Sequence, residues 1–214
     1  MCSPPDTFSV GQTRTDMRYT VSMATLARSR RPATIRDLDD LPEDVVGHIV
    51  DGELIVLPRP DAPHVEAASF LHGVLFSAFW RELGDPGGWV ILPEPKITFG
   101  EQLLVPDLAG WKVGRYLRPQ KGPYEVMPDW VCEILSPSTA GFDRATKLPI
   151  YSRSGIGHAW VIDPIARTLE VFRQHQEGWL FAAAFQNRDK VRAEPFEAIE
   201  IDLSLLWGVE ASKE

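Results

Sequence analysis

The distribution of apolar and polar residues predicts helices and strands in a mixed order along the chain. Residues 34–44, TIRDLDDLPED, have the pattern of a short helix. The stretch GHIVDGELIVLP, residues 47–58, predicts two strands joined by a tight turn at Asp51 and Gly52, since Asp-Gly between apolar runs is typical of a hairpin. We therefore expect a helix and a β-hairpin in this part of the chain.

A longer helix is predicted from His64 onward, because apolar residues recur there at spacings of three and four positions. The segment GDPGG, residues 84–88, ends this helix, since glycine and proline disfavour its continuation. We expect the helix to cover one face of a sheet. The residues predicted to face the core are Val65, Ala68, Leu71, Leu75, Phe79 and Leu83.

The middle of the chain predicts the sheet itself. GWVILPEPKITFG (88–100) and QLLVPDLAGWKV (102–113) are expected to form successive strands. The loop KGPYEVMP (121–128) separates them from WVCEIL (130–135), whose apolar and β-branched residues are typical of a buried strand.

One more helix and several strands are predicted after this point. The segment from Asp143 to Arg153 predicts a helix that is kinked or starts late, because Pro149 lacks a backbone donor. The stretches predicted as strands are IGHAWVIDP (156–164), RTLEVFRQ (167–174) and GWLFAAAF (178–185). The residues expected to pack on the core near the end of the chain are Leu205, Leu206 and Trp207.

Together these elements predict an α/β fold with a mixed β-sheet flanked by helices. Residues 1–30 show no helical or alternating period, so we expect a flexible extension in which Met23 is an alternative start. Residues 31–214 are expected to form a single domain, because a chain of 214 residues with 44% hydrophobic residues can bury one sizeable core.

The composition of the chain restricts the kinds of partner it can bind and the cell compartment in which it is expected. The formal net charge is −8, which excludes a general polycationic surface for nucleic acid or anionic membrane. Cys2 and Cys132 form neither a disulfide framework nor a zinc-ligand cluster. No apolar run is long enough to span a bilayer, and the N-terminus lacks the pattern of a secretory signal. We therefore expect a soluble, cytoplasmic protein that does not bind membranes.

Two acidic residues occupy positions that folding alone does not explain. Glu133 lies inside an apolar strand, and Asp107 follows an apolar run and Pro106. An isolated ionised carboxylate is costly in an apolar setting. The two acids could meet across the sheet, where a divalent cation would balance their charge. Mg²⁺ commonly takes one or two carboxylates and keeps several waters, which suits phosphate chemistry.

Three stretches together carry a resemblance to a known family. They are DGELIVLPRPDAPH (51–64), LLVPDLAGW (103–111) and PDWVCEILSPSTAGFDRATKLPIYSRSGIGHAWVIDP (128–164). In this order they closely resemble the Uma-two family of restriction endonucleases, within the PD-(D/E)XK nuclease superfamily. The resemblance runs from about Arg31 to Trp207 and implies a restriction-endonuclease-like α/β core.

The resemblance also implies the residues of a metal site. Asp107 matches the aspartate of the PD element and Glu133 the acid of the next strand, so both would bind Mg²⁺ or Mn²⁺, with the main-chain carbonyl of Ile134 as a third ligand. The superfamily motif has a lysine two residues after the second acid, where this chain has Leu135. In the Uma-two pattern the lysine lies on the following helix, and Lys147 in FDRATK matches it. Lys147 would place and polarise the attacking water.

A histidine after a proline-rich loop is a further feature of the family pattern, and His64 matches it. If this end of the helix faces the cleft, the imidazole would contact the scissile phosphate or a metal-bound water. The other histidines, at positions 48, 72, 158 and 175, show no ligand spacing and are interpreted as structural.

Each candidate also has a structural explanation that the sequence leaves open. Glu133 could be a strand-edge carboxylate that is capped by the backbone of SPST (136–139) or paired with Arg144. Asp107 could form an Asx-type turn after proline. Lys147 could be a solvated helix residue paired with an acid four positions earlier. The residues interpreted as a helix cap and as core packing are Asp143 and Tyr151, respectively.

These features predict a divalent-metal-dependent endonuclease that hydrolyses DNA through a metal-activated water. The alternative is a catalytically weak or inactive nucleic-acid-binding or assembly protein on the same fold, because position 135 has no lysine. A third hypothesis is a hydrolase of nucleotides or other small molecules that uses the same metal site. DNA is the expected partner, and a homodimer would suit a duplex with two strands to cut.

Overall fold

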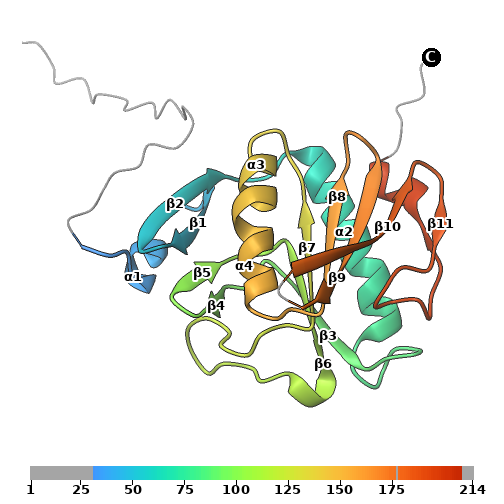
Figure 1. The fold of residues 1–214 in the computed structure, drawn as a ribbon, viewed down its shortest axis with the longest axis horizontal. Coiled ribbons are helices and arrows are strands. Elements are labelled where there is room, and N and C mark those ends of the chain that lie inside the picture. Colours follow the sequence, from blue (N-terminus) through green and yellow to red (C-terminus); the bar gives the residue numbers. More distant parts are fainter. Residues whose placement is uncertain (1–30, 177, 209–214) are drawn as a thin grey trace, which may run out of the picture.

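The computed structural model describes residues 31–176 and 178–208 (Figure 1). The predicted extension at residues 1–30, with Met23 and Cys2, lies outside the described residues. Within the described part of the chain, no helix combines the length and the apolarity needed to cross a membrane.

A six-stranded mixed sheet forms the centre of the fold (Figure 1). Strands β7 and β8 are parallel, and the other neighbours in the order β10-β9-β8-β7-β6-β3 are antiparallel. This arrangement confirms the predicted α/β fold with a mixed sheet. The strands are β3 (Trp89–Pro93), β6 (Leu108–Lys112), β7 (Trp130–Ile134), β8 (His158–Asp163), β9 (Thr168–His175) and β10 (Gly178–Gln186).

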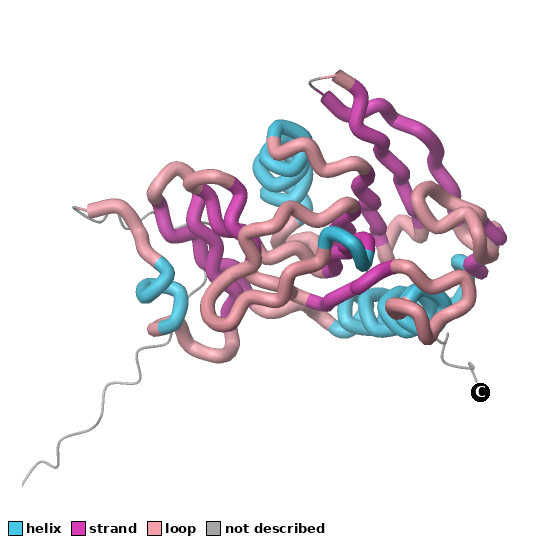
Figure 2. Tube along the Cα trace, turned by 90° about the horizontal axis from the view of Figure 1, so that it is seen from below, coloured by secondary structure: helices cyan, strands magenta, loops and turns pink. Residues whose placement is uncertain are grey.

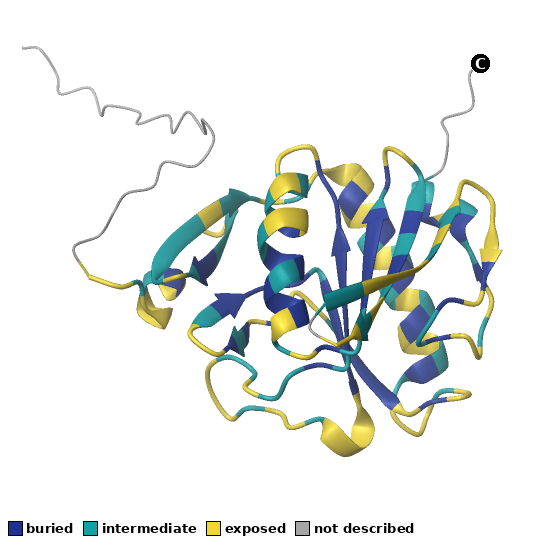
Figure 3. Cartoon of the chain, viewed as in Figure 1, coloured by how far each residue is buried: buried dark blue, intermediate teal, exposed yellow. Residues whose placement is uncertain are grey.

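Helices cover both faces of this sheet. On one face, α2 (Ala62–Phe79) packs against Trp130 of β7. On the other face lies a continuous helical segment built from α3 (Ala140–Phe142), the π-helical turn η2 (Asp143–Lys147) and α4 (Leu148–Arg153) (Figure 3). Successive side chains of a strand point to opposite faces, so Val131 and Glu133 of β7 both face the second helical segment.

A second sheet lies beside the first, at one end of the molecule (Figure 2). Residues 88–113 were predicted to form successive strands, and the strands that they form are divided between the two sheets. The first and last of them, β3 and β6, pair with each other in the large sheet, whereas β5 pairs with β1 of the hairpin and β4 pairs with β5. The elements of this region are α1 (Ile35–Asp39), β1 (Val45–Val50), β2 (Glu53–Pro58), β4 (Ile97–Phe99) and β5 (Gln102–Leu104).

The hairpin of this second sheet turns where the sequence predicted. Asp51 and Gly52 both adopt positive φ angles, 51° and 75°. Two-residue hairpin turns whose twist matches that of the flanking strands require this conformation. Glycine tolerates this conformation without strain. The turn sets the register of β1 against β2, and so decides which side chains of β1 face the rest of the molecule.

The two longer predicted helices need correction in their limits. The helix α2 begins at Ala62 after the N-cap Asp61, two residues before the predicted His64, and ends at Phe79. Val65 is 50% exposed and Leu83, beyond the helix, is 86% exposed, so neither is part of the core. The helical residues that are buried on this face are Ala67, Leu71, Leu75 and Phe79.

The segment around Pro149 begins earlier than predicted. Helical structure starts at Ala140, and the π-helical turn at residues 143–147 ends two residues before the proline. A π-helical turn inserts one extra residue per turn, so the missing donor of Pro149 is accommodated without ending the helix.

The residues predicted to pack on the core near the end of the chain do so only in part. Here β11 (Lys190–Val191), β12 (Ile201–Asp202) and the 3₁₀ helix η3 (Leu203–Trp207) complete the fold, whereas the short 3₁₀ helix η1 (Val113–Arg115) follows β6. Leu206 is buried and Trp207 packs against the core, but Leu205 is 56% exposed. The prediction for Leu205 was therefore wrong, because the 3₁₀ turn rotates it away from the neighbours of Leu206.

Candidate active site

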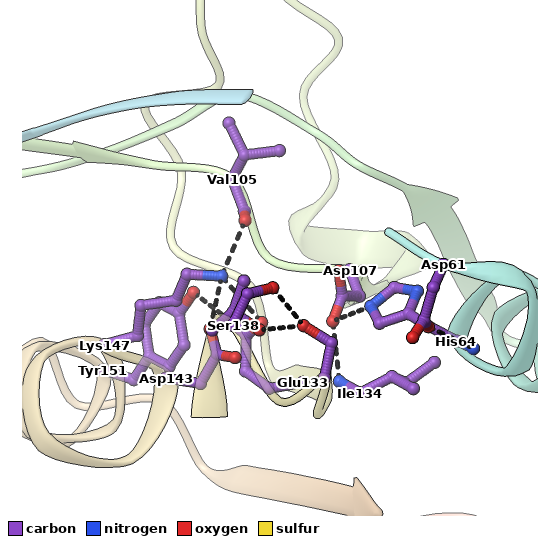
Figure 4. Close-up of polar contacts among 12 residues, drawn as sticks. Asp61, His64, Val105, Asp107, Glu133, Ile134, Ser138, Asp143, Lys147 and Tyr151 are labelled. Carbon is purple, nitrogen blue, oxygen red and sulfur yellow. Dashed lines mark hydrogen bonds and ion pairs between the residues drawn. The ribbon is translucent and has the colours of Figure 1, made fainter. Parts of the chain in front are cut away.

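The two predicted acids lie next to each other at the junction of β6 and β7. Asp107 directly precedes β6, and Glu133 lies in β7, which pairs with β6 through Leu108 and Cys132. The backbone N–H of Ile134 donates a hydrogen bond of 2.6 Å to Asp107 Oδ2, which brings the two strands' acidic residues together (Figure 4). The expected meeting of Asp107 and Glu133 across the sheet is thus observed.

Glu133 is completely buried and both of its oxygens accept hydrogen bonds. Tyr151 Oη donates to Oε1 at 2.5 Å, and Lys147 Nζ donates to Oε2 at 2.8 Å (Figure 4). The alternative partner Arg144 instead forms an ion pair with Glu170. Tyr151 therefore does more than pack in the core, since its hydroxyl fixes the orientation of the Glu133 carboxylate.

Lys147 reaches the acids from the helix on the same face. Its ammonium donates to Val105 O at 3.2 Å and to Glu133, and lies 3.0 Å from Asp143 Oδ1. Burial alone would lower the pKa of Lys147, but Glu133, Asp143 and Asp107 together raise it, so the ammonium stays charged. The side chain is buried, which contradicts a solvated helix residue, although the predicted contact with Asp143 is present.

Position 135 does not supply the positive charge of the superfamily lysine. It is occupied by Leu135, which is buried in the core on the face covered by the helical segment of residues 140–153. The helix after β7 instead returns over the end of that strand, and its π-helical turn carries both Asp143 and Lys147. These two side chains lie one turn apart and are both buried. Asp143 is a partner of Lys147 rather than the cap of this helix, which starts after Thr139.

His64 projects from the first turn of α2 onto Asp107. Its Nε2 lies 3.1 Å from Asp107 Oδ2 (Figure 4). Burial would lower the pKa of His64, but the hydrogen bond and charge of Asp107 outweigh it and raise that pKa. For Asp107 the effect of burial is opposite, because burial alone would raise the pKa of a carboxyl group. His64 and Lys147 outweigh it and bring the pKa of Asp107 below its usual value. Asp107 therefore stays ionised, and its Oδ1 is the oxygen left for another ligand.

Carboxyl groups outnumber the buried ammonium in this site. Burial raises the pKa of Glu133 and of Asp143, against the opposing charge of Lys147. Asp107 adds a third carboxyl group close by. A further positive charge would therefore be stabilised here, and this chemistry suits a divalent cation.

A cavity of about 40 Å³ adjoins these groups, which is room for a few water-sized particles. Next to it lies a wider hollow of about 370 Å³ that shares Pro60, His64, Glu94 and Asp107 with the cavity. The polar side chains that line the small cavity are His48, His64, Glu94, Asp107, Ser136, Thr139, Asp143 and Lys147. The site is thus reached from the surface between α2 and the second sheet.

The donor set is compatible with a hard cation such as Mg²⁺ or Mn²⁺. Among residues 31–176 and 178–208, no group of three His, Cys, Asp or Glu side chains has the arrangement of a metal site. Mg²⁺ does not need such a group, because it is commonly held by one or two carboxylates and completes its shell with waters. The groups that could hold it are Asp107, Glu133 and the main-chain carbonyl of Ile134.

Three residues that contact Val105, Lys147 or Glu133 at this site were not among the sequence-based candidates: His48, Asp143 and Tyr151. Tyr151 lies four positions after Lys147, so the two share a helix face, and this spacing was the available signal. Asp143 precedes Lys147 by the same spacing. His48 gave no signal, because it belongs to the other sheet and reaches the cavity only through the tertiary fold.

Tyr151→Phe should destabilise the protein by about 1–3 kcal/mol, because it leaves a buried carboxyl oxygen without its donor. Urea unfolding of wild type and variant at equal m-value measures this difference. Tyr116→Phe is the matched control, since its hydroxyl makes only a 3.5 Å contact with Tyr124 in a half-buried position. Equal stability of Tyr151→Phe and wild type would show that this hydroxyl does not hold Glu133.

Comparisons with known proteins concern the family and the fold of the chain. The Uma2 family, described as "Putative restriction endonuclease", matches residues 35–205. A solved structure from Anabaena variabilis ATCC 29413, described as "a putative nuclease belonging to DUF820", superposes with a TM-score of 0.66 and 24% sequence identity. That match covers 82% of this chain and 98% of the other, and it shows a shared fold. No curated protein matches the chain. Because the family match spans more than half of the sequence, this chain belongs to the Uma2 family of nucleases.

Proposed function

We propose that this protein is a divalent-metal-dependent endonuclease that hydrolyses DNA phosphodiester bonds. The observation that supports this most directly is the position of Asp107, directly before β6, next to Glu133 of the adjacent strand β7. Lys147 reaches the same point from the following helix. The bound ion would supply a water activated for attack and would stabilise the charge of the phosphate in the transition state.

The carboxylates have distinct surroundings that suit this role. Asp107 Oδ2 is occupied by the Ile134 N–H and by His64, which fixes the side chain while Oδ1 remains for the ion. Glu133 is held at Oε1 by Tyr151, so that Oε2 stays at the position it shares with Lys147. Fixed ligand oxygens of this kind keep the ion in place relative to the substrate.

Lys147 contributes a fixed positive charge. Its three acceptors, Val105 O, Glu133 and Asp143, orient the ammonium towards the cavity wall that Asp107 also lines. A preorganised charge at this point would offset the negative charge that develops on the phosphate. His64, held by Asp107, would contact a phosphate oxygen or a water bound to the ion.

One observation favours a second candidate function, that of a catalytically weak or inactive nucleic-acid-binding protein on the same fold. The ammonium of Lys147 has three N–H groups, and protein acceptors surround it in equal number. A lysine engaged in this way has no donor left for a water unless one of these contacts opens. Divalent-metal binding and DNA binding without turnover would support this candidate.

The test is nicking or linearisation of supercoiled plasmid. We expect wild type to cut in Mn²⁺ or Mg²⁺ and to lose activity in a chelator. Glu133→Gln should cut at least about 100-fold more slowly, because the ion supplies several kcal/mol of transition-state stabilisation and each 1.36 kcal/mol is tenfold in rate. Circular dichroism checks that the variant is folded. Equal activity of wild type and variant would indicate a contaminant and would contradict the proposal.

The same assay separates the substrate classes. A mononucleotide phosphodiester should be cut far more slowly than a duplex, because it lacks the backbone contacts that hold DNA in place. Comparable rates on both would instead support a hydrolase of small molecules. We also propose that two copies act on one duplex, and the dependence of linear product on protein concentration tests this pairing.

A further inference from the structure

His48 brings a group from the second sheet to the cavity beside Asp107. It lies in β1, a strand that pairs with β2 and β5 and not with the strands of the acids. Its side chain is only 1% exposed, yet the ring lines the cavity together with Asp107 and Lys147. A buried polar side chain on a cavity wall needs a partner or a ligand.

Val105 fixes which nitrogen of His48 carries the proton. The Val105 N–H donates to His48 Nδ1 at 3.2 Å, so Nδ1 is an acceptor and the proton of the neutral ring is on Nε2. Phe142 packs against the ring with centroids 5.2 Å apart and restrains its rotation. The carbonyl of the same Val105 accepts from Lys147, so one peptide segment positions both side chains.

The neutral state of His48 has a clear physical cause. Burial lowers its pKa well below the usual value, and the nearby Lys147 ammonium lowers it further. The ring therefore offers one N–H donor and no charge. Among the residues that the structure describes, Nε2 has no hydrogen-bond partner, whereas the hydrogens of Lys147 are directed to protein acceptors.

A phosphate oxygen in this cavity would require an uncharged N–H donor of this kind. Asp107, Asp143 and Glu94 line it and would repel a phosphate, and Lys147 is already engaged. An N–H donor that carries no charge can bind a phosphate oxygen without disturbing the balance between these acids and a cation.

We propose that His48 is a further substrate-contacting residue, whose Nε2–H donates to a phosphate oxygen of the nucleic-acid backbone at this cavity. This inference rests on the proposed nuclease function and adds a residue to it from a different sheet. The hairpin β1-β2 and its sheet thereby form one wall of the substrate site.

Two amide variants separate this role from a structural one. His48→Asn keeps an acceptor near the position of Nδ1 for the Val105 N–H but has no group at the position of Nε2. His48→Gln places an N–H donor near Nε2 but loses the acceptor at Nδ1. A role in binding phosphate predicts that glutamine is tolerated and asparagine is not. A role confined to the contact with Val105 predicts the opposite.

The experiment measures the dissociation constant of a short fluorescent duplex in Ca²⁺, which tests binding without relying on turnover, and then kcat and KM in Mn²⁺. His48→Asn should weaken duplex binding and kcat/KM by roughly 10- to 100-fold, the range for a hydrogen bond to a charged group. His48→Gln should stay within about threefold of wild type. Calorimetric Mn²⁺ affinity should be unchanged in both variants, because His48 is not placed on the ion.

Three results would overturn the inference. Wild-type behaviour of His48→Asn with impaired His48→Gln would confine the residue to its contact with Val105. Equal losses in both variants, accompanied by lower thermal stability, would make its role structural. A wild-type protein that neither binds nor cuts DNA would refute the proposed function itself, and this outcome is distinct because no variant is needed to see it.

Discussion

Asp107→Asn should abolish Mn²⁺ binding in calorimetry and reduce plasmid cleavage by about 1,000-fold or more. Mutation of a residue that only hydrogen-bonds to a metal ligand typically lowers metal affinity by about 10–100-fold. Removal of the charge of a ligand itself should lower the affinity by more than that. Cleavage should fall in parallel, because several kcal/mol of transition-state stabilisation come with the ion. Asparagine keeps an oxygen that accepts from the Ile134 N–H, so the fold should persist.

Asp40→Asn is the matched control for this change. Asp40 is exposed at the end of α1 and does not line the cavity, so the same substitution there should leave Mn²⁺ affinity and cleavage unaltered. If Asp107→Asn bound Mn²⁺ as tightly as wild type, the ion would have to be held without this carboxylate. The metal site proposed here would then be wrong in its first ligand.

The sequence could predict that Asp107 and Glu133 lie close together because their positions follow from local features, and the family resemblance added Lys147. A charge in an apolar strand and an acid after Val105-Pro106 are visible without tertiary structure. The helix after β7 must return along the sheet, since β7 and β8 are parallel neighbours joined by it. A residue in that helix was therefore within reach of the strand end, as the family resemblance implied.

The partners of these residues could not be predicted in the same way. His48 approaches from a separate sheet, and nothing in GHIVDG distinguishes a cavity residue from a core histidine. The division of residues 88–113 between two sheets is equally hidden. All four strands contain mainly apolar residues, so their sequences do not distinguish the strands of one sheet from those of the other.

The buried face of α2 was predicted in part: Leu71, Leu75 and Phe79 are buried as predicted, whereas Val65 is exposed and Leu83 lies beyond the helix. The misplaced residues have a related cause. Glu66 is the only residue among Asp, Glu, Lys and Arg in this helix, so apolar positions occur around its whole circumference. A period of three to four then fits more than one face. The fold buries Ala67, Leu71, Leu75 and Phe79 and leaves Val65 at the surface. The burial of a residue in this helix therefore depends on its neighbours in the fold rather than on its own hydrophobicity.

Lys147→Ala should destabilise the protein by about 3–5 kcal/mol, the range for removing one partner of a buried ion pair. The variant leaves Glu133 and Asp143 buried without their counter-charge and Val105 O without its donor. Chemical unfolding in urea, followed by circular dichroism, measures the loss. Lys112→Ala is the control, because the same change at an exposed lysine should stay within about 0.5 kcal/mol.

The deficit should depend on pH with a definite sign. Burial already holds the pKa of Glu133 and of Asp143 above their usual values, and removal of Lys147 should raise both further. A carboxyl group whose pKa is higher in the folded than in the unfolded state stabilises the fold at low pH and loses this contribution as pH rises through the folded-state pKa. Lys147→Ala should therefore lie closest to wild type near or below about pH 4, the unfolded pKa of such groups.

A double variant isolates the cause. Glu133→Gln combined with Lys147→Met removes the Lys147–Glu133 pair and keeps side chains of similar length, so it should recover a large part of the stability lost in Lys147→Ala. Asp143 remains without its partner and accounts for what is not recovered. If the double variant were as unstable as Lys147→Ala at every pH, the loss would come from the cavity left by the lysine stem rather than from unpaired charge. Cleavage should be absent in both variants, because each lacks the fixed ammonium beside the two acids.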